Sequence, residues 1–89
     1  MLSKEIKIIN RLGLHARAAA QLVRMASGYP CDIHLEKDGQ VSNAKSVMEV
    51  LMLGAPAGTS IKVSAEGEKE EEALRAIVAL FEARFHELE

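Results

Sequence analysis

A histidine and an arginine lie close together where a strand-like pattern changes into a helical one. Gly13 permits a tight backbone path, His15 stands at the threshold of the helix, and Arg17 follows in its first turn. No Ser, Thr, Asp or Asn lies near His15 to cap the helix, so the first backbone N–H groups lack an obvious side-chain partner. Such a helix end favours an anion, and a histidine placed there can carry a phosphoryl group covalently.

Plainer interpretations exist for both residues: His15 would merely cap the helix or fill a loop, and Arg17 would be a solvated surface arginine. Histidine ordinarily titrates at roughly pH 6.5, however, so its ring is largely neutral and nucleophilic near neutrality. The helix end and the guanidinium disfavour an imidazolium and favour an anionic, phosphorylated ring. Arg17, Gln21 and Arg24 also share one helical stripe, which offers positive charge to an acidic partner.

The segment 47–53 is apolar at every position except Glu49. One interpretation is a short helix that is buried all round. The other is that Val47, Met48 and Leu51 form an exposed apolar patch beside His15, since flexible methionines suit a surface that accepts several partners. The two interpretations predict opposite exposures for these three side chains.

Ser46 and Glu49 have the spacing of a capping box at the start of that segment. Ser46 is then the helix N-cap, and the same position could serve as a regulatory phosphorylation site because a helix start favours phosphate. His34 and His86 lie far from His15 along the chain, without metal-ligand spacing, so we expect no metal and no cofactor.

The composition of the 89 residues is typical of a globular protein, and we expect one domain over 1–89. The net charge of −2 argues against a general nucleic-acid binder. A single cysteine, Cys31, argues against a disulfide framework. The sequence shows neither a signal peptide nor a membrane span. These features predict a cytoplasmic protein without membrane insertion.

Alternating and helical patterns predict the order β-α-β-β-α-β-α. The expected strands cover 4–9, 31–36, 40–43 and 61–66, and Asp38-Gly39 indicates a hairpin. The expected helices run over 16–27, from Ser46 to Gly54, and from about Glu68 to the end, with Phe81, Phe85 and Leu88 on one face. Since each strand has one apolar face, we expect an α+β domain with helices on one side of an antiparallel sheet.

Two motifs resemble those of a known family, the histidine-containing phosphocarriers called HPr. Residues 13–19 resemble its active-site signature, and residues 43–48 resemble its serine-site signature. The resemblance covers essentially the whole chain, and it implies an open-faced β-sandwich, with a four-stranded antiparallel sheet covered on one face by three helices. Ala18 departs from the proline of many members, and Glu49 departs from the glycine or lysine often found there.

The resemblance also implies a function in the phosphoenolpyruvate-dependent phosphotransferase system. His15 would accept a phosphoryl group on Nδ1 from phosphorylated enzyme I and pass it to a histidine of an EIIA domain. Arg17 would neutralise charge, and the N–H groups of Ala16 and Arg17 would hold the phosphoryl oxygens. Ser46 matches the residue that HPr kinase/phosphorylase modifies in some bacteria. The expected protein is a monomeric carrier rather than an enzyme.

Two alternatives remain. The chain could be a carrier of the nitrogen-related branch of the same system, which regulates rather than feeds sugar uptake, and the C-terminal helix with Phe81 and Phe85 is compatible with that. It could also be a non-catalytic regulatory or ligand-binding α+β domain, in which His15 would be incidental.

Overall fold

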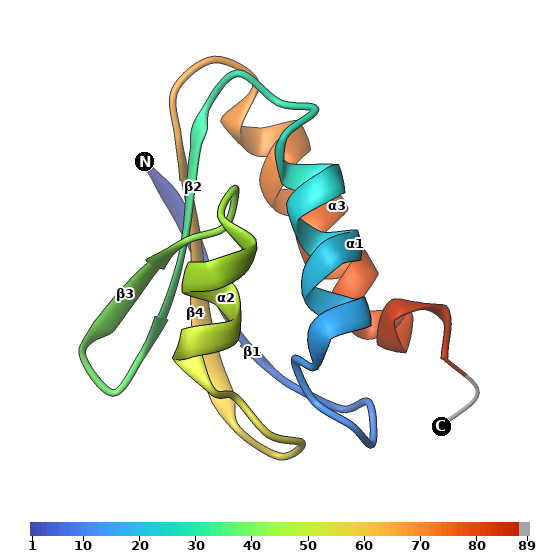
Figure 1. Cartoon of the computed structure of the whole chain (residues 1–89). Coiled ribbons are helices and arrows are strands. Elements are labelled where there is room, and N and C mark those ends of the chain that lie inside the picture. Colours follow the sequence, from blue (N-terminus) through green and yellow to red (C-terminus); the bar gives the residue numbers. More distant parts are fainter. Residues whose placement is uncertain (88–89) are drawn as a thin grey trace.

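A four-stranded antiparallel sheet and three α-helices make up the fold (Figure 1). The computed structural model describes residues 1–87. The strands lie in the order β1-β4-β2-β3, and the helices cover one face of the sheet. The elements are β1 (Leu2–Lys7), α1 (Ala16–Ala26), β2 (Asp32–Lys37), β3 (Gln40–Asn43), α2 (Val47–Leu53), β4 (Ser60–Glu66), α3 (Glu70–Glu82) and a 3-10 turn, η1 (Arg84–His86). The predicted α+β open-faced sandwich is therefore confirmed.

Alternation along the strands explains why only one face is covered. In β4, Ile61, Val63 and Ala65 are buried, whereas Lys62 is exposed. The buried side chains pack against the apolar faces of the helices, as the period of two in a strand requires. The sequence of β4 thus places one face in the core and the other in water.

The C-terminal helix is shorter than predicted at both ends. It starts at Glu70, after Lys69 in a left-handed conformation with φ 64°, and it ends at Glu82. Arg84, Phe85 and His86 then have positive φ angles, so these residues do not continue the α-helix that was predicted to run to the end of the chain. Leu88, predicted on the apolar face, lies outside the described residues.

Burial of Phe85 accounts for the turn that follows α3. Its ring is 1% exposed and meets Phe81 edge to face, with ring centroids 4.9 Å apart. Aromatic pairs favour this geometry, and burial of a phenylalanine side chain stabilises by roughly 2 kcal/mol. The turn brings the next residues back over the start of α1, where the predicted site lies.

The other bounds differ little from the prediction. β1 covers 2–7 rather than 4–9, and Cys31 is buried just before β2 rather than within it. α1 ends at Ala26, and Gly28 follows it in a turn. Within residues 1–87 no helix combines the length and apolar character needed to cross a membrane.

Candidate functional site

His15 is itself the N-cap of α1. Its backbone is extended (φ −78°, ψ 178°), and its Nδ1 accepts a hydrogen bond from the Arg17 N–H at 3.3 Å. The expectation that the helix start has no side-chain partner is therefore wrong, because the imidazole takes the place of a serine or aspartate. A nitrogen that accepts from an N–H carries a lone pair, so Nδ1 is the unprotonated ring nitrogen in this arrangement.

Gly13 allows the loop before His15 to pass close to the loop that follows α2. Its φ is +65°, and a Cβ atom there would lie 2.6 Å from the Ala55 carbonyl oxygen. The same carbonyl accepts a hydrogen bond from the Leu14 N–H at 3.0 Å. Only glycine fits this approach, which sets the position of the His15 backbone.

Two residues that the sequence analysis did not single out complete the surroundings of His15. Asn10 is fully buried, and its Nδ2 donates hydrogen bonds to the Gly13 carbonyl at 2.8 Å and to Glu87 Oε1 at 2.9 Å. The other carboxylate oxygen of Glu87, Oε2, contacts Nε2 of His15. Glu87 therefore lies between Asn10 and the imidazole ring.

The hydrogen bond from Asn10 is the largest influence that lowers the pKa of the Glu87 carboxyl below its ordinary value. Burial opposes this change, whereas the contact with His15 and the charges of His15 and Arg17 add to it. Glu87 is consequently a carboxylate at neutral pH, and it lies 72 positions from His15 in the chain. No local pattern could have indicated this pair.

Arg17 and Gln21 lie on one side of α1, as their spacing predicts. Both line an open pocket of about 710 Å³, to which Leu12 and the tail residues Phe85 to Glu87 also contribute. Arg24 is exposed further along the helix, and Ala16 is exposed in the first turn. The structure thus brings Arg17 and Gln21 to the same opening, which is next to the residues around His15.

α2 begins at Ser46, whose Oγ accepts a hydrogen bond from the Glu49 N–H at 3.3 Å. The reciprocal half of the predicted capping box is not made, because Glu49 Oε1 accepts from the Asn43 N–H at 2.9 Å instead. The carboxylate thereby ties the helix start to the end of β3, and the Ser46 N–H donates to the Asn43 carbonyl. Ser46 is half-buried.

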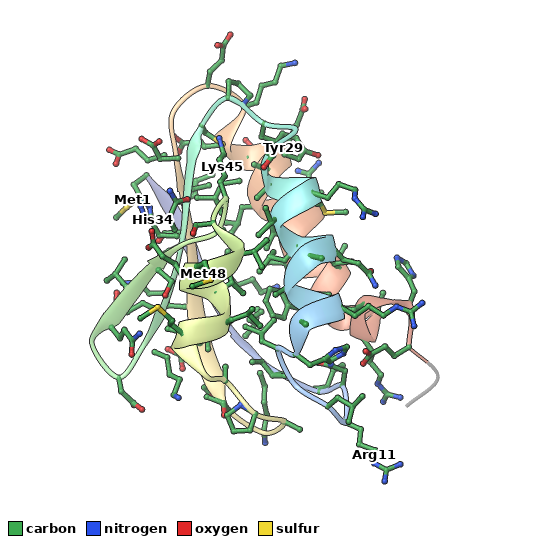
Figure 2. All side chains as sticks on the ribbon, viewed as in Figure 1. Met1, Arg11, Tyr29, His34, Lys45 and Met48 are labelled. Carbon is green, nitrogen blue, oxygen red and sulfur yellow. The ribbon has the colours of Figure 1, made fainter. Side chains whose placement is uncertain are left out.

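The apolar face of α2 divides into a buried part and an exposed part. Val50 and Leu53 are buried, whereas the other side of α2 is open, so the helix is not buried all round. Val47, Met48 and Leu51 are 39%, 69% and 37% exposed, and Met52, one turn after Met48, is exposed as well. Figure 2 shows Met48 on α2. We call these four residues the α2 patch; α2 packs against α1, the helix that His15 caps.

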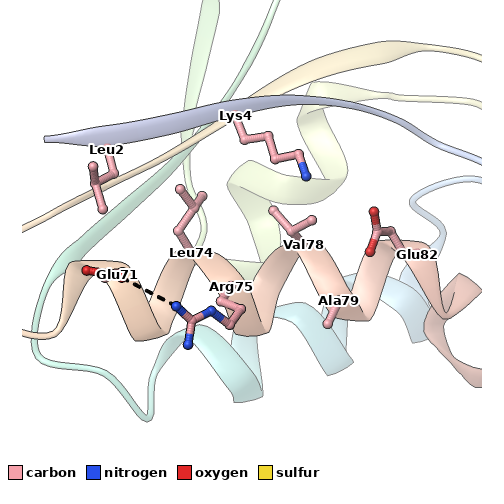
Figure 3. Close-up of a pocket in the computed structure, with 8 residues that line it drawn as sticks. All are labelled: Leu2, Lys4, Glu71, Leu74, Arg75, Val78, Ala79 and Glu82. Carbon is pink, nitrogen blue, oxygen red and sulfur yellow. Dashed lines mark hydrogen bonds and ion pairs between the residues drawn. The ribbon is translucent and has the colours of Figure 1, made fainter.

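A second pocket lies between β1 and α3, and Figure 3 shows its lining. Leu2, Leu74 and Val78 form its apolar part, with Lys4 and Arg75 near the rim. None of the predicted site residues lines it. Among residues 1–87, no group of His, Cys, Asp and Glu is arranged to hold a metal ion.

Comparison with known families shows to which family the chain belongs. The family model described as "PTS HPr component phosphorylation site" matches residues 2–83. The chain belongs to the HPr family. HPr proteins are phosphocarriers of the phosphotransferase system, so this chain is a carrier rather than a catalytic enzyme.

Individual relatives of this HPr match over nearly their full lengths. The phosphocarrier HPr of Pseudomonas aeruginosa is 49% identical over 84 residues, 93% of each chain. The phosphocarrier NPr of Escherichia coli is 42% identical over 83 residues, 92% of each chain. The crystal structure of HPr-C-His from Thermoanaerobacter tengcongensis has a TM-score of 0.95 and 47% identity, covering 98% of each chain.

Proposed function

We propose that His15 is the residue of this HPr that carries the phosphoryl group during transfer. It accepts a phosphoryl group on Nδ1 from phosphorylated enzyme I and passes it to a histidine of an EIIA domain. The bond from Nδ1 to phosphorus forms while the bond from phosphorus to the donor nitrogen breaks, and that electron pair stays with the donor. The observation that carries this proposal is the Nδ1 lone pair at the N-terminus of α1, 3.3 Å from the Arg17 nitrogen.

The start of α1 supports the proposal electrostatically. Once a phosphoryl group occupies Nδ1, the N–H groups of Ala16 and Arg17 can donate to its oxygens, because no intrahelical carbonyl accepts from them. Arg17, which is exposed, adds a positive charge in the first turn of the helix. The protein supplies position and charge complementarity, and enzyme I supplies the reactive donor.

The partner-docking surface in this proposal consists of Gln21 and Arg24 on α1 together with Val47, Met48 and Leu51 of the α2 patch. The arginine offers charge to an acidic partner, and the exposed apolar side chains offer area that a partner can bury. No cofactor, metal or nucleic acid takes part. We place the protein in the cytoplasm, as a single domain over 1–89.

We propose a monomer for the unbound state. A solved HPr of Thermoanaerobacter tengcongensis is described as a dimer. Sedimentation at micromolar concentration therefore provides the relevant check on this point.

Ser46 is proposed as a regulatory phosphorylation site for HPr kinase/phosphorylase. The hydroxyl lies at the start of α2, where a phosphate would meet the helix N-terminus. Incubation with the kinase and ATP should add one phosphate to the intact mass. The Ser46→Ala variant should remain unmodified, and uptake in that variant would contradict the assignment.

The nitrogen-related branch is a second candidate pathway, favoured by the 42% identity with the phosphocarrier NPr. Both pathways use the same transfer chemistry on His15. They differ in the EIIA domain that accepts the phosphoryl group. Competition between a sugar-specific and a nitrogen-related EIIA domain for the phosphorylated protein would distinguish them.

The His15→Ala variant tests the central proposal. The wild type should take up one phosphoryl group from phosphoenolpyruvate and enzyme I, and His15→Ala should take up none, as measured by intact mass. His34→Ala is the matched control, because His34 lies in β2 opposite Asn43 and Ser64 and plays no part in the proposed transfer. Phosphorylation of His15→Ala at the wild-type rate would refute the assignment.

A further inference from the structure

Glu87 contacts the reacting ring but has no role in the function proposed above. Its side chain is 16% exposed and that of His15 is 25% exposed, so both groups are largely shielded from water. The two carboxylate oxygens have different partners: Oε1 accepts from Asn10, and Oε2 contacts Nε2 of His15. A hydrogen bond to an ionised acceptor in such surroundings is stronger than one between neutral groups.

Two contacts impose the same protonation pattern on the His15 ring. The Glu87 carboxylate can only accept a hydrogen bond, so Nε2 must carry the hydrogen. The Arg17 N–H can only donate, so Nδ1 must carry the lone pair. The hydrogen-bond partner of one ring nitrogen decides the state of the other.

We propose that Glu87, held by Asn10, is a positioning residue that keeps the hydrogen of His15 on Nε2 and directs Nδ1 toward the phosphoryl donor. The transfer step in this inference rests on the proposed function of His15. When Nδ1 bonds to phosphorus, the Nε2 hydrogen stays in place and the ring becomes positively charged. The Glu87 carboxylate faces that charge, so no proton has to leave during transfer.

Asn10 fixes the position of the Glu87 carboxylate beside His15. It is fully buried, and its amide nitrogen donates to both Gly13 and Glu87. Since both partners are acceptors, the amide orientation is determined. Asn10 therefore joins the tail to the loop that places His15, and the buried Phe85 ring anchors the tail two positions earlier.

Glu87→Gln is a sharp test because it changes almost no volume. Glutamine offers one oxygen and one NH2 group in place of two acceptor oxygens. It must therefore either place two donor groups face to face at Asn10 or direct an N–H toward Nε2 of His15. Glu82→Gln is the matched control, because Glu82 is an exposed acid at the end of α3 that lines the other pocket. Glu87→Ala removes both contacts.

The first measurement is NMR of the His15 ring in the unphosphorylated, nitrogen-15-labelled protein, about two pH units above the ordinary histidine pKa. In the wild type and in Glu82→Gln, we expect a proton on Nε2 that is protected from exchange with water. In Glu87→Gln and Glu87→Ala, that proton should exchange at least about tenfold faster. Equal protection in all four proteins would overturn the proposal.

The second measurement is the rate of phosphoryl uptake from phosphorylated enzyme I. Loss of the hydrogen-bond partner behind a metal-ligating histidine typically costs about tenfold or more, and we expect a similar cost here: Glu87→Gln should be slower by about tenfold and Glu82→Gln unchanged. An unaltered rate in Glu87→Gln would overturn the positioning role. If the wild type took up no phosphoryl group, the proposed function would fail, whereas the exchange measurement would still decide what Glu87 does to the ring.

Discussion

Arg17 contributes twice at the residue scale, through its backbone and through its side chain. Its N–H donates to Nδ1 of His15, and its guanidinium is exposed at the rim of the pocket beside the C-terminal tail. Only the side chain can be removed by substitution. The two contributions can therefore be measured separately.

Arg17→Ala should slow phosphoryl transfer to and from His15 by about a hundredfold, since it removes one preorganised positive group near the phosphoryl oxygens. The backbone N–H and the fold remain, so the circular dichroism spectrum should not change. Rapid-quench mixing with phosphorylated enzyme I measures the rate of phosphoryl transfer to His15. Arg75→Ala removes the same charge from the exposed face of α3 and should transfer normally; equal rates in both variants would count against Arg17.

Asn10 and Glu87 belong to the surroundings of His15, although no local sequence motif indicates them. His15 and Arg17 stand out because their types and spacing suit an anion. Asn10 and Glu87 do not stand out, since an asparagine before a loop and a glutamate in an acidic tail are common. Their importance follows from which side chains lie next to them.

At the element scale, the helix starts are stabilised in three different ways. α1 is capped by His15, α2 by Ser46, and α3 has no side-chain cap at Lys69. In α3, Glu70 Oε1 instead accepts a hydrogen bond from the Gly67 N–H at 3.0 Å, and Glu70 also pairs with the N-terminal ammonium group at 3.5 Å. The start of α3 therefore depends on an ionised carboxylate.

Glu70 should make the stability of the protein depend on pH. The Gly67 N–H is the main cause that holds the pKa of the Glu70 carboxyl below its ordinary value, burial opposes it, and the ammonium group adds to it. A carboxyl whose pKa is lower in the folded state stabilises above its unfolded pKa, and the contribution is lost as pH falls through the folded pKa. Relative to Glu70→Gln, the wild type should be more stable at neutral pH.

Urea unfolding of the two proteins between neutral pH and about pH 2 measures this difference, which should vanish at the acid end. Glu72→Gln is the control, because it removes a charge from the same turn of α3 without touching the Gly67 hydrogen bond. A wild-type advantage that persists in acid would contradict the assignment.

At the scale of the whole molecule, His15 is partly exposed at the start of α1. Arg17, Gln21 and Arg24 lie on α1 and the α2 patch lies on α2, and these two helices pack against each other. The outer face of the sheet lies on the opposite side (Figure 1). A partner that reaches His15 should therefore contact both helices at once.

Met48→Asp should weaken binding to enzyme I by about tenfold, because a charge replaces an exposed apolar contact at the centre of the α2 patch. Aspartate is tolerated near a helix N-terminus, so the fold should persist. Val41→Asp, at an exposed apolar residue of β3, is the control. Chemical-shift mapping should show changes in α1 and α2, and silence of α2 would remove the patch from the docking surface.

The sequence by itself determined most of the fold and the identity of the phosphoryl-accepting candidate. Strand alternation, the hairpin at 38–39 and the cap at Ser46 depend on neighbours a few positions apart, so their patterns are visible in the chain. The same holds for His15 and Arg17. The prediction was wrong about the helix start before Ala16 and about the end of α3.

The cap at His15 joins residues two positions apart, whereas only the tertiary structure decided where α3 ends and which residue contacts the other ring nitrogen. Burial of Phe85 against Phe81 ends α3 early and turns the tail toward Asn10. Glu87 thereby reaches a ring that lies 72 positions away, a contact that no sequence period records. The ring that seemed to stand before an uncapped helix is itself the cap, and packing at the far end of the chain holds its other nitrogen.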